Sequence, residues 1–396
     1  MDLPTRKTAL FAAIYLMEIC YGLFLLVASL LAVRVTESPF VLGLTGTLHV
    51  ATRILGNVGF GRLSDRIGRK RLLLIACVLF MAAYATLRFR SLICIFLAYF
   101  VAGVANSIFW PVMEAWIGDG EQREGLMRFL GAFAIVFTVG IASGSLLGGL
   151  FMRIAPLASI VIGLFLLTLV AILIFRTKDQ PIEGHGTAAA AGLEAADRTK
   201  HRMFLSIGWV ANFGTWVTIG IMRFLFPKLC VGMGISTVYI GGINTVLYCL
   251  WAVTSFLLIR FRRWTYRLGP LIAFQLVGVA AMLIAWFYPS TGTFFAAFGL
   301  FGVSAGMTYL SSVFYGQDGA ADRGTKSGLH EMILGLGMLF GPFVGGTLAQ
   351  IFELRTPLLF ASAAIVAAIA VEVRLASGTT WTLRMFKLKT RKIATR

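Results

Sequence analysis

Twelve long apolar segments, separated by polar ones, most constrain what this chain can fold into. A helix needs about 20 apolar residues to cross the hydrocarbon core of a bilayer. The chain of 396 residues is 58% hydrophobic and only 13% charged, whereas a soluble domain carries roughly 25% charged residues. We therefore predict an all-α integral membrane protein. The predicted spans are 9–33, 40–61, 71–88, 92–118, 128–152, 156–176, 203–227, 234–259, 269–288, 292–316, 327–351 and 356–376.

The gaps between these segments are mostly short, so neighbouring helices should be antiparallel. The exception is 177–202, a polar stretch rich in Ala and Gly, which we predict to be a flexible cytoplasmic linker. The predicted organisation has four parts. These are an N-terminal six-helix bundle at 1–176, the linker at 177–202, a C-terminal six-helix bundle at 203–378, and a basic cytoplasmic tail at 379–396. The tail either lies on anionic headgroups or is solvated.

The basic residues predict the orientation of the chain in the membrane. With the N-terminus inside, 27 of the 35 Lys and Arg residues fall on the inner side and 6 on the outer side. Cytoplasmic loops carry an excess of Lys and Arg. We therefore expect a multi-pass protein of the cell (inner) membrane with both termini cytoplasmic. The net charge of +18 does not indicate nucleic acid, because the charges lie between spans.

Glycines reveal an internal repeat. Five glycines of segment 128–152 recur in segment 327–351 at one offset of 197 residues: Gly131, Gly140, Gly144, Gly148 and Gly149 against Gly328, Gly337, Gly341, Gly345 and Gly346. This offset predicts two parallel pseudo-repeat bundles, as in transporters. Glycine lets helix backbones approach closely. The pattern indicates either tight packing alone or flexing of the two helices, assisted by Pro342.

A cationic turn between the second and third segments has the sequence Gly61-Arg-Leu-Ser-Asp-Arg-Ile-Gly-Arg-Lys-Arg71. It matches the pattern G-x-x-x-D-R-x-G-R-[RK]-[RK], and over essentially its whole length the chain resembles the major facilitator superfamily (MFS). The resemblance implies that Asp65 faces the start of helix eleven and that Arg69 pairs with Asp119. Such contacts close the cytoplasmic side. The expected gate residues are Gly61, Asp65, Arg66, Gly68, Arg69, Glu114 and Asp119. The corresponding segment 260–269 lacks the acid.

The glycine pattern also resembles a superfamily antiporter signature, G-x8-G-x3-G-P-x2-G-G. Segment 327–351 contains all of it, whereas Ser145 replaces the proline in segment 128–152. This resemblance favours export. A second superfamily signature places an arginine in the middle of helix four. Segment 92–118 has no arginine, which weakens a direct transfer of that proton-coupling mechanism.

Charged residues inside spans usually face a cavity or a partner. Glu18 is the main candidate for proton coupling, with His49 and Arg53, four residues apart on one helix face, as further candidates. Arg53 is alternatively the counter-ion of Glu18, an anion ligand or an interhelical strut. Arg223 either lines the cavity or snorkels to the outer surface. We expect Glu372 to be a boundary charge.

Polar and aromatic residues of several spans are candidates for a substrate cavity. Each one alone is more often a packing residue or an interfacial anchor. Together they indicate an amphipathic organic solute. The candidates are Tyr21, Asn106, Trp110, Trp216, Arg223, Tyr248 and Tyr309.

We therefore predict a monomeric secondary active transporter that moves a small organic solute by alternating access, with proton-coupled export as the leading function. The alternatives are uptake or facilitated diffusion of a sugar or metabolite, and a non-transporting sensor or assembly protein on the same scaffold. A nucleotide-binding loop, Gly-x-x-x-x-Gly-Lys-[Ser/Thr], does not occur in the sequence. The histidines are scattered, and no cysteine pair has metal or redox spacing, so we expect no enzyme activity, no metal and no cofactor.

Overall fold

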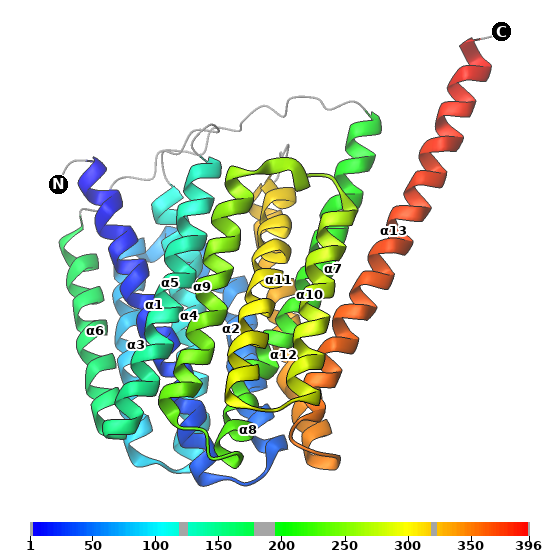
Figure 1. The fold of residues 1–396 in the computed structure, drawn as a ribbon. Helices are drawn as coiled ribbons and strands as arrows, with labels where there is room; N and C mark the ends of the chain where they lie inside the picture. Colours follow the sequence, from blue (N-terminus) through cyan, green and yellow to red (C-terminus); the bar gives the residue numbers. More distant parts are fainter. Residues whose placement is uncertain (1–2, 119–125, 178–194, 318–322, 395–396) are drawn as a thin grey trace.

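The computed structural model is a bundle of long, roughly parallel and antiparallel helices (Figure 1). It describes residues 3–118, 126–177, 195–317 and 323–394, and these residues contain helices but no strand. The α-helices are α1 (Leu3–Val35), α2 (Pro39–Ile67), α3 (Arg69–Thr86), α4 (Leu92–Gly118), α5 (Leu126–Ile154), α6 (Pro156–Arg176), α7 (Ala195–Phe224), α8 (Phe226–Gly232), α9 (Thr237–Arg260), α10 (Leu268–Phe287), α11 (Thr291–Gln317), α12 (Arg323–Ile351) and α13 (Thr356–Ala394).

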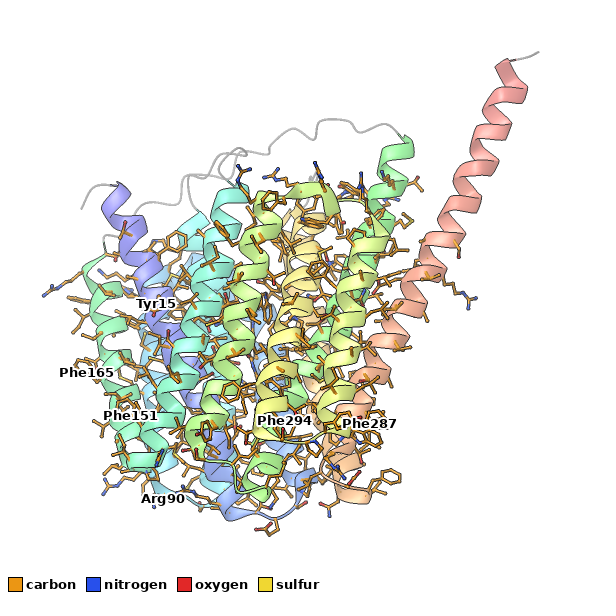
Figure 2. The ribbon with its side chains drawn as sticks, in the orientation of Figure 1. Tyr15, Arg90, Phe151, Phe165, Phe287 and Phe294 are labelled. Atoms are coloured by element: carbon orange, nitrogen blue, oxygen red, sulfur yellow. The ribbon has the colours of Figure 1, made fainter. Side chains whose placement is uncertain are left out.

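Eleven of these helices are long and apolar enough to cross a membrane, judged on their described residues. α2 is not one of the eleven; it contains His49 and Arg53, and the side chains of its residues 57–66 lie outside the described part of the chain. The prediction of twelve spans is thus met for eleven of them. Large apolar side chains on the outside of the bundle, such as Phe165 and Phe287, are 57% and 60% exposed (Figure 2). An apolar outer surface of this kind suits contact with lipid.

Two helix boundaries differ from the predictions. α7 begins at Ala195, so the last part of the predicted linker 177–202 is already helical. α13 continues to Ala394 and projects beyond the bundle, so the predicted tail 379–396 is helical up to that residue (Figure 1). The helical parts of the predicted linker and tail, 195–202 and 379–394, contain no proline that would stop a helix. Both contain Ala, Arg and Lys, which favour helix.

The start of α1 and the end of α13 lie at the same end of the bundle, which we call the terminal face (Figure 1). The opposite end, where α2 and α9 begin, is called the distal face. On the predicted orientation the terminal face is cytoplasmic.

Several of the repeated glycines lie where two helices approach each other closely. A Cβ added at Gly140 would lie 2.5 Å from the Cβ of Glu18, and one at Gly144 would collide with the carbonyl of Ile19, so α5 packs directly on α1. In the second half, a Cβ at Gly337 would lie 2.6 Å from the carbonyl of Phe213 on α7. The equivalent glycine Gly341 meets the carbonyl of Val217. These contacts support tight packing as one role of the repeat. Flexing stays a prediction, and α12 runs unbroken through Pro342.

Glycines also close the distal face between the two halves. A Cβ at Gly149 of α5 would lie 3.1 Å from the Cα of Gly241 on α9. The equivalent Gly346 of α12 has the same 3.1 Å approach to Gly43 on α2. Each half therefore contributes one glycine-bearing helix that packs against the other half. Because only glycine allows backbones this close, the two halves are in tight contact at the distal face.

Candidate functional site

Arg223 lies in the last turn of α7 and points into the bundle. Its side chain is only 6% exposed. Its Nε donates a hydrogen bond of 2.9 Å to the Tyr248 hydroxyl of α9, and the Ser29 hydroxyl of α1 donates to its backbone oxygen at 3.0 Å. The guanidinium carbon also lies 5.6–5.8 Å from the ring centroids of Tyr21, Trp216 and Tyr248. The snorkelling alternative is therefore wrong, because the side chain is anchored to inward-facing residues.

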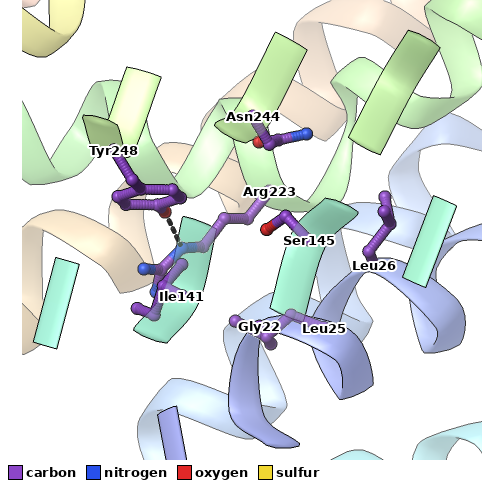
Figure 3. Close-up of a pocket in the computed structure, with 8 residues that line it drawn as sticks. All are labelled: Gly22, Leu25, Leu26, Ile141, Ser145, Arg223, Asn244 and Tyr248. Carbon is purple, nitrogen blue, oxygen red and sulfur yellow. Dashed lines mark hydrogen bonds between the residues drawn. The ribbon is translucent and has the colours of Figure 1, made fainter. Parts of the chain in front are cut away.

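Arg223 borders two cavities. The distal one lies between α1, α5, α7 and α9. It is lined by Gly22, Leu25, Leu26, Ile141, Ser145, Arg223, Asn244 and Tyr248. Figure 3 shows Arg223 reaching between Tyr248 and Ile141. The second cavity involves residues nearer the terminal ends of α5, α11 and α12. It is lined by Tyr21, Arg53, Trp110, Phe133, Phe137, Trp216, Arg223, Tyr309, Glu331 and Leu334.

Five of the seven predicted cavity residues line this terminal-side cavity: Tyr21, Trp110, Trp216, Arg223 and Tyr309. Tyr248 lines the distal cavity. Asn106 lines neither. Its side chain instead accepts a hydrogen bond of 3.2 Å from Trp110 Nε1 and donates one of 2.8 Å to the carbonyl of Ala102. Asn106 therefore orients Trp110 in these contacts, and a direct place for Asn106 in a cavity lining stays a prediction.

Phe133 and Phe137 are cavity residues that the sequence interpretation missed. They sit on α5 at positions 133 and 137, followed by Gly140 and Gly144 on the same helix face. The glycines mark the side of α5 that packs inward. Extending that face by two turns toward the helix start would have identified both rings.

Arg53 and Glu331 form an ion pair across the bundle. Arg53 Nη2 of α2 lies 2.9 Å from Glu331 Oε2 of α12, and the two side chains are 19% and 28% exposed. This contact supports the interhelical-strut alternative for Arg53, whereas the carboxyl oxygens of Glu18 have no hydrogen-bond partner among the described residues. The pair lies in the wall of the terminal-side cavity and connects the two halves.

We expect fast transport to require the ion pair between Arg53 and Glu331. Arg53→Gln or Glu331→Gln alone should slow transport severalfold, because each removes one charge of the ion pair that joins α2 to α12. The swap Arg53→Glu with Glu331→Arg should restore part of the rate. Initial uptake rates in vesicles carrying each variant measure this coupling. A swapped protein as slow as the worse single variant would contradict the prediction.

Glu18 is completely buried, and neither of its carboxyl oxygens has a hydrogen-bond partner among the described residues. It lies on α1 one turn before Tyr21 and Gly22, which line the two cavities, and it packs under Gly140 of α5. Arg223 and Arg53 are the charged groups whose fields act on it. An unpaired carboxylate in an apolar site is costly unless it takes up a proton.

His49 connects α1, α2 and α4. Its Nδ1 lies 3.0 Å from the carbonyl oxygen of Tyr99, and its Nε2 lies 3.0 Å from the Tyr21 hydroxyl. A carbonyl can only accept, so Nδ1 carries the proton and Nε2 accepts from Tyr21. With both nitrogens engaged, His49 holds the Tyr21 ring against the cavity. This arrangement favours a positioning role over proton coupling.

Part of the predicted gate falls on residues outside the described part of the chain. The structure describes only the helical backbone at four of these residues, Gly61, Asp65, Arg66 and Glu114. Asp119 lies outside the described residues altogether, so the expected Arg69–Asp119 pair stays a prediction. Gly68 is the single residue between α2 and α3 and has φ +95°, a conformation that favours glycine. Arg69 follows it and is buried.

Glu372, expected as a boundary charge, is instead fully buried on α13. It accepts a hydrogen bond of 2.8 Å from Gln275 of α10, away from both cavities. No group of three or more His, Cys, Asp or Glu in the described ranges could hold a metal ion.

The comparisons with known proteins agree with this architecture. A family model described as Major Facilitator Superfamily matches residues 10–327. The chain belongs to the Major Facilitator Superfamily. Among solved structures, it is similar to a bacterial homologue of the human lysosomal transporter Spinster in an inward-facing, occupied conformation. The TM-score is 0.74 and the identity 16%, covering 95% of this chain and 98% of that one. A second similar structure is the nucleoside transporter NupG, with a TM-score of 0.68 and 13% identity, covering 95% of this chain and 99% of that one.

One curated relative extends the comparison. Multidrug resistance protein 1 of Bacillus subtilis (strain 168) is 23% identical over 333 residues, covering 79% of this chain and 81% of the relative. MFS proteins are membrane transporters and generally not enzymes. Family and fold together place this chain among multi-pass membrane proteins that carry small molecules.

Proposed function

We propose that this MFS protein is a proton-coupled secondary transporter that moves a small organic solute by alternating access. The observation that carries the proposal is the position of Arg223, which borders both the distal and the terminal-side cavity. A single buried group can then contact a solute that enters from either face. Rocking of two related bundles about such a central site is the expected motion in transporters of this kind.

Glu18 is the proposed proton carrier, since it is buried and unpaired beside the residues that line the cavities. The terminal face is the proposed cytoplasmic side, with the turn around Asp65 and Arg69 as its gate. At the distal face, the glycine contacts between α5 and α9 and between α2 and α12 form the proposed outer gate.

We propose export as the first direction to test. Its support is the antiporter-like glycine pattern of α12 and the name of the multidrug resistance relative. Uptake of a solute together with protons is the second candidate. The cationic Arg223 favours it, because an anionic solute bound there would weaken the field that stabilises a charged Glu18. Solute and proton would then bind together and move together.

The test is proton movement in everted membrane vesicles with an acidic lumen, challenged with a library of small organic solutes. Export by exchange predicts that at least one solute enters the lumen while protons leave it. Vesicles without the protein are the control. Protons that move in the same direction as the solute would establish the second candidate. No solute flux across the library would contradict transport itself.

A further inference from the structure

The Arg223 guanidinium keeps its outer edge available for a ligand. Arginine has five N–H donors in a planar fork. Nε donates to the Tyr248 hydroxyl at 2.9 Å, and among the described residues Nη1 contacts a weak acceptor, the Met338 sulfur, at 3.8 Å. Nη2 is buried and has no hydrogen-bond partner among the described residues. The donors that remain belong to the Nη1–Nη2 edge, which can bind a carboxylate with two parallel hydrogen bonds.

The surroundings of Arg223 stabilise its charge without occupying those donors. Tyr21, Trp216 and Tyr248 surround the guanidinium with aromatic rings, whose negative faces attract a cation. Within the described chain, no carboxylate lies within 4 Å of it, and Glu331 is taken by Arg53. Glu18 is the acid on which the field of Arg223 acts, but its oxygens make no hydrogen bond to the guanidinium, so a bound anion would be the counter-charge in direct contact.

The walls of the terminal-side cavity are rich in aromatic rings. Phe137 of α5 and Tyr309 of α11 lie parallel within 2°, with their ring centroids 6.5 Å apart. Trp110 of α4 meets Phe137 edge to face at 6.2 Å. The rings come from both halves of the bundle and line the same cavity as Arg223. Aromatic rings favour such stacked and edge-to-face contacts with one another.

We propose that this site binds an aromatic carboxylate, with the carboxylate on the Nη1–Nη2 edge of Arg223 and the ring among Trp110, Phe137 and Tyr309. The proposal rests on the proposed function in taking the terminal-side cavity as the solute site. It names the substrate class, which neither the family nor the fold determines. A cationic solute is disfavoured because it would meet Arg223 in the same aromatic surroundings.

The experiment measures binding to the full chain purified in detergent, by calorimetry. The probes are 2-naphthoate, its neutral counterpart 2-naphthamide and the cation 2-naphthylmethylammonium. The expected result is that naphthoate binds at least about tenfold more tightly than naphthamide, and that Arg223→Gln removes this preference. Arg223→Lys should retain only part of it, because lysine keeps the charge but loses the planar fork.

Arg355→Gln is the matched control. Arg355 is a partly exposed arginine in the turn between α12 and α13, paired with Glu353 at 2.9 Å, and it lines neither cavity. Its loss should leave the naphthoate preference unchanged. Melting temperatures and gel filtration of all variants show that each remains folded.

Three results would overturn the proposal: tighter binding of the cation, an anion preference that survives Arg223→Gln in a folded protein, or no binding of any probe by the unaltered protein. The outcome is separable from that of the transport assay. Arg223-dependent naphthoate binding without flux in vesicles would contradict transport and leave the anion site standing. Flux of a solute that does not depend on Arg223 would leave transport standing and contradict the anion site.

Discussion

Glu18→Gln is expected to reduce proton-coupled solute movement to the level of vesicles that lack the protein. Glutamine has nearly the same shape as a protonated glutamate, but it cannot take up or release a proton. Glu18 is fully buried and its carboxyl oxygens have no hydrogen-bond partner within the described ranges, so the substitution breaks no hydrogen bond there. The measurement is solute-induced change of lumenal pH in everted vesicles.

A matched control separates the loss of a proton carrier from the loss of a buried carboxyl group. Glu372 is as completely buried as Glu18, yet it bonds to Gln275 on the outer helix pair α10 and α13. Glu372→Gln should therefore retain proton coupling. In Glu18→Gln, exchange of solute without net proton movement should persist, because the cavities remain intact. A Glu18→Gln protein with undiminished proton movement would exclude Glu18 as the carrier.

Cross-linking the distal face is expected to stop transport completely. The Ser38 hydroxyl of α2 donates a hydrogen bond of 2.7 Å to Gln350 Oε1 of α12, near the close approach of Gly43 and Gly346. Cysteines at positions 38 and 350 should therefore react with a short bifunctional thiol reagent. Once joined, α2 and α12 cannot separate, and alternating access requires that they do. Initial transport rates before and after cross-linking measure the effect.

The native cysteines must first be replaced, because Cys249 is exposed and Cys94 partly so. Each single variant, Ser38→Cys or Gln350→Cys, treated with the same reagent should keep its transport rate. A reductant should restore transport if the linker contains a cleavable disulfide. Full transport by the cross-linked protein would show that the distal glycine contact is not a gate that must open.

Much of the fold was predictable because its signals are local. Apolar length defined the helices, and the 197-residue glycine offset placed α5 and α12 in equivalent positions. Those glycines do make equivalent contacts, Gly144 with α1 and Gly341 with α7. α2 is the predicted span that apolar length did not recover among the described residues. It carries His49, which contacts α1 and α4, and Arg53, which pairs with α12.

The candidate site was predictable as a set of residues but not as an arrangement. Glu18, Arg53 and Arg223 were recognisable because charge within a span is costly wherever it occurs. Which of them pairs with which depends on helix faces brought together from distant parts of the chain. Arg53 and Glu331 are separated by 278 residues, and no pattern in the sequence between them specifies their contact.

The sequence by itself therefore determined that the chain is built for a membrane, that its helices are long, that it contains a repeat, and which family it resembles. These follow from residue composition and spacing within single segments. Only the tertiary structure decided that Arg223 points inward between two cavities, that Glu331 neutralises Arg53, and that Glu18 is left without a hydrogen-bond partner. The physical reason is that the burial and pairing of a charge depend on the neighbours that packing supplies, and these neighbours lie on other helices.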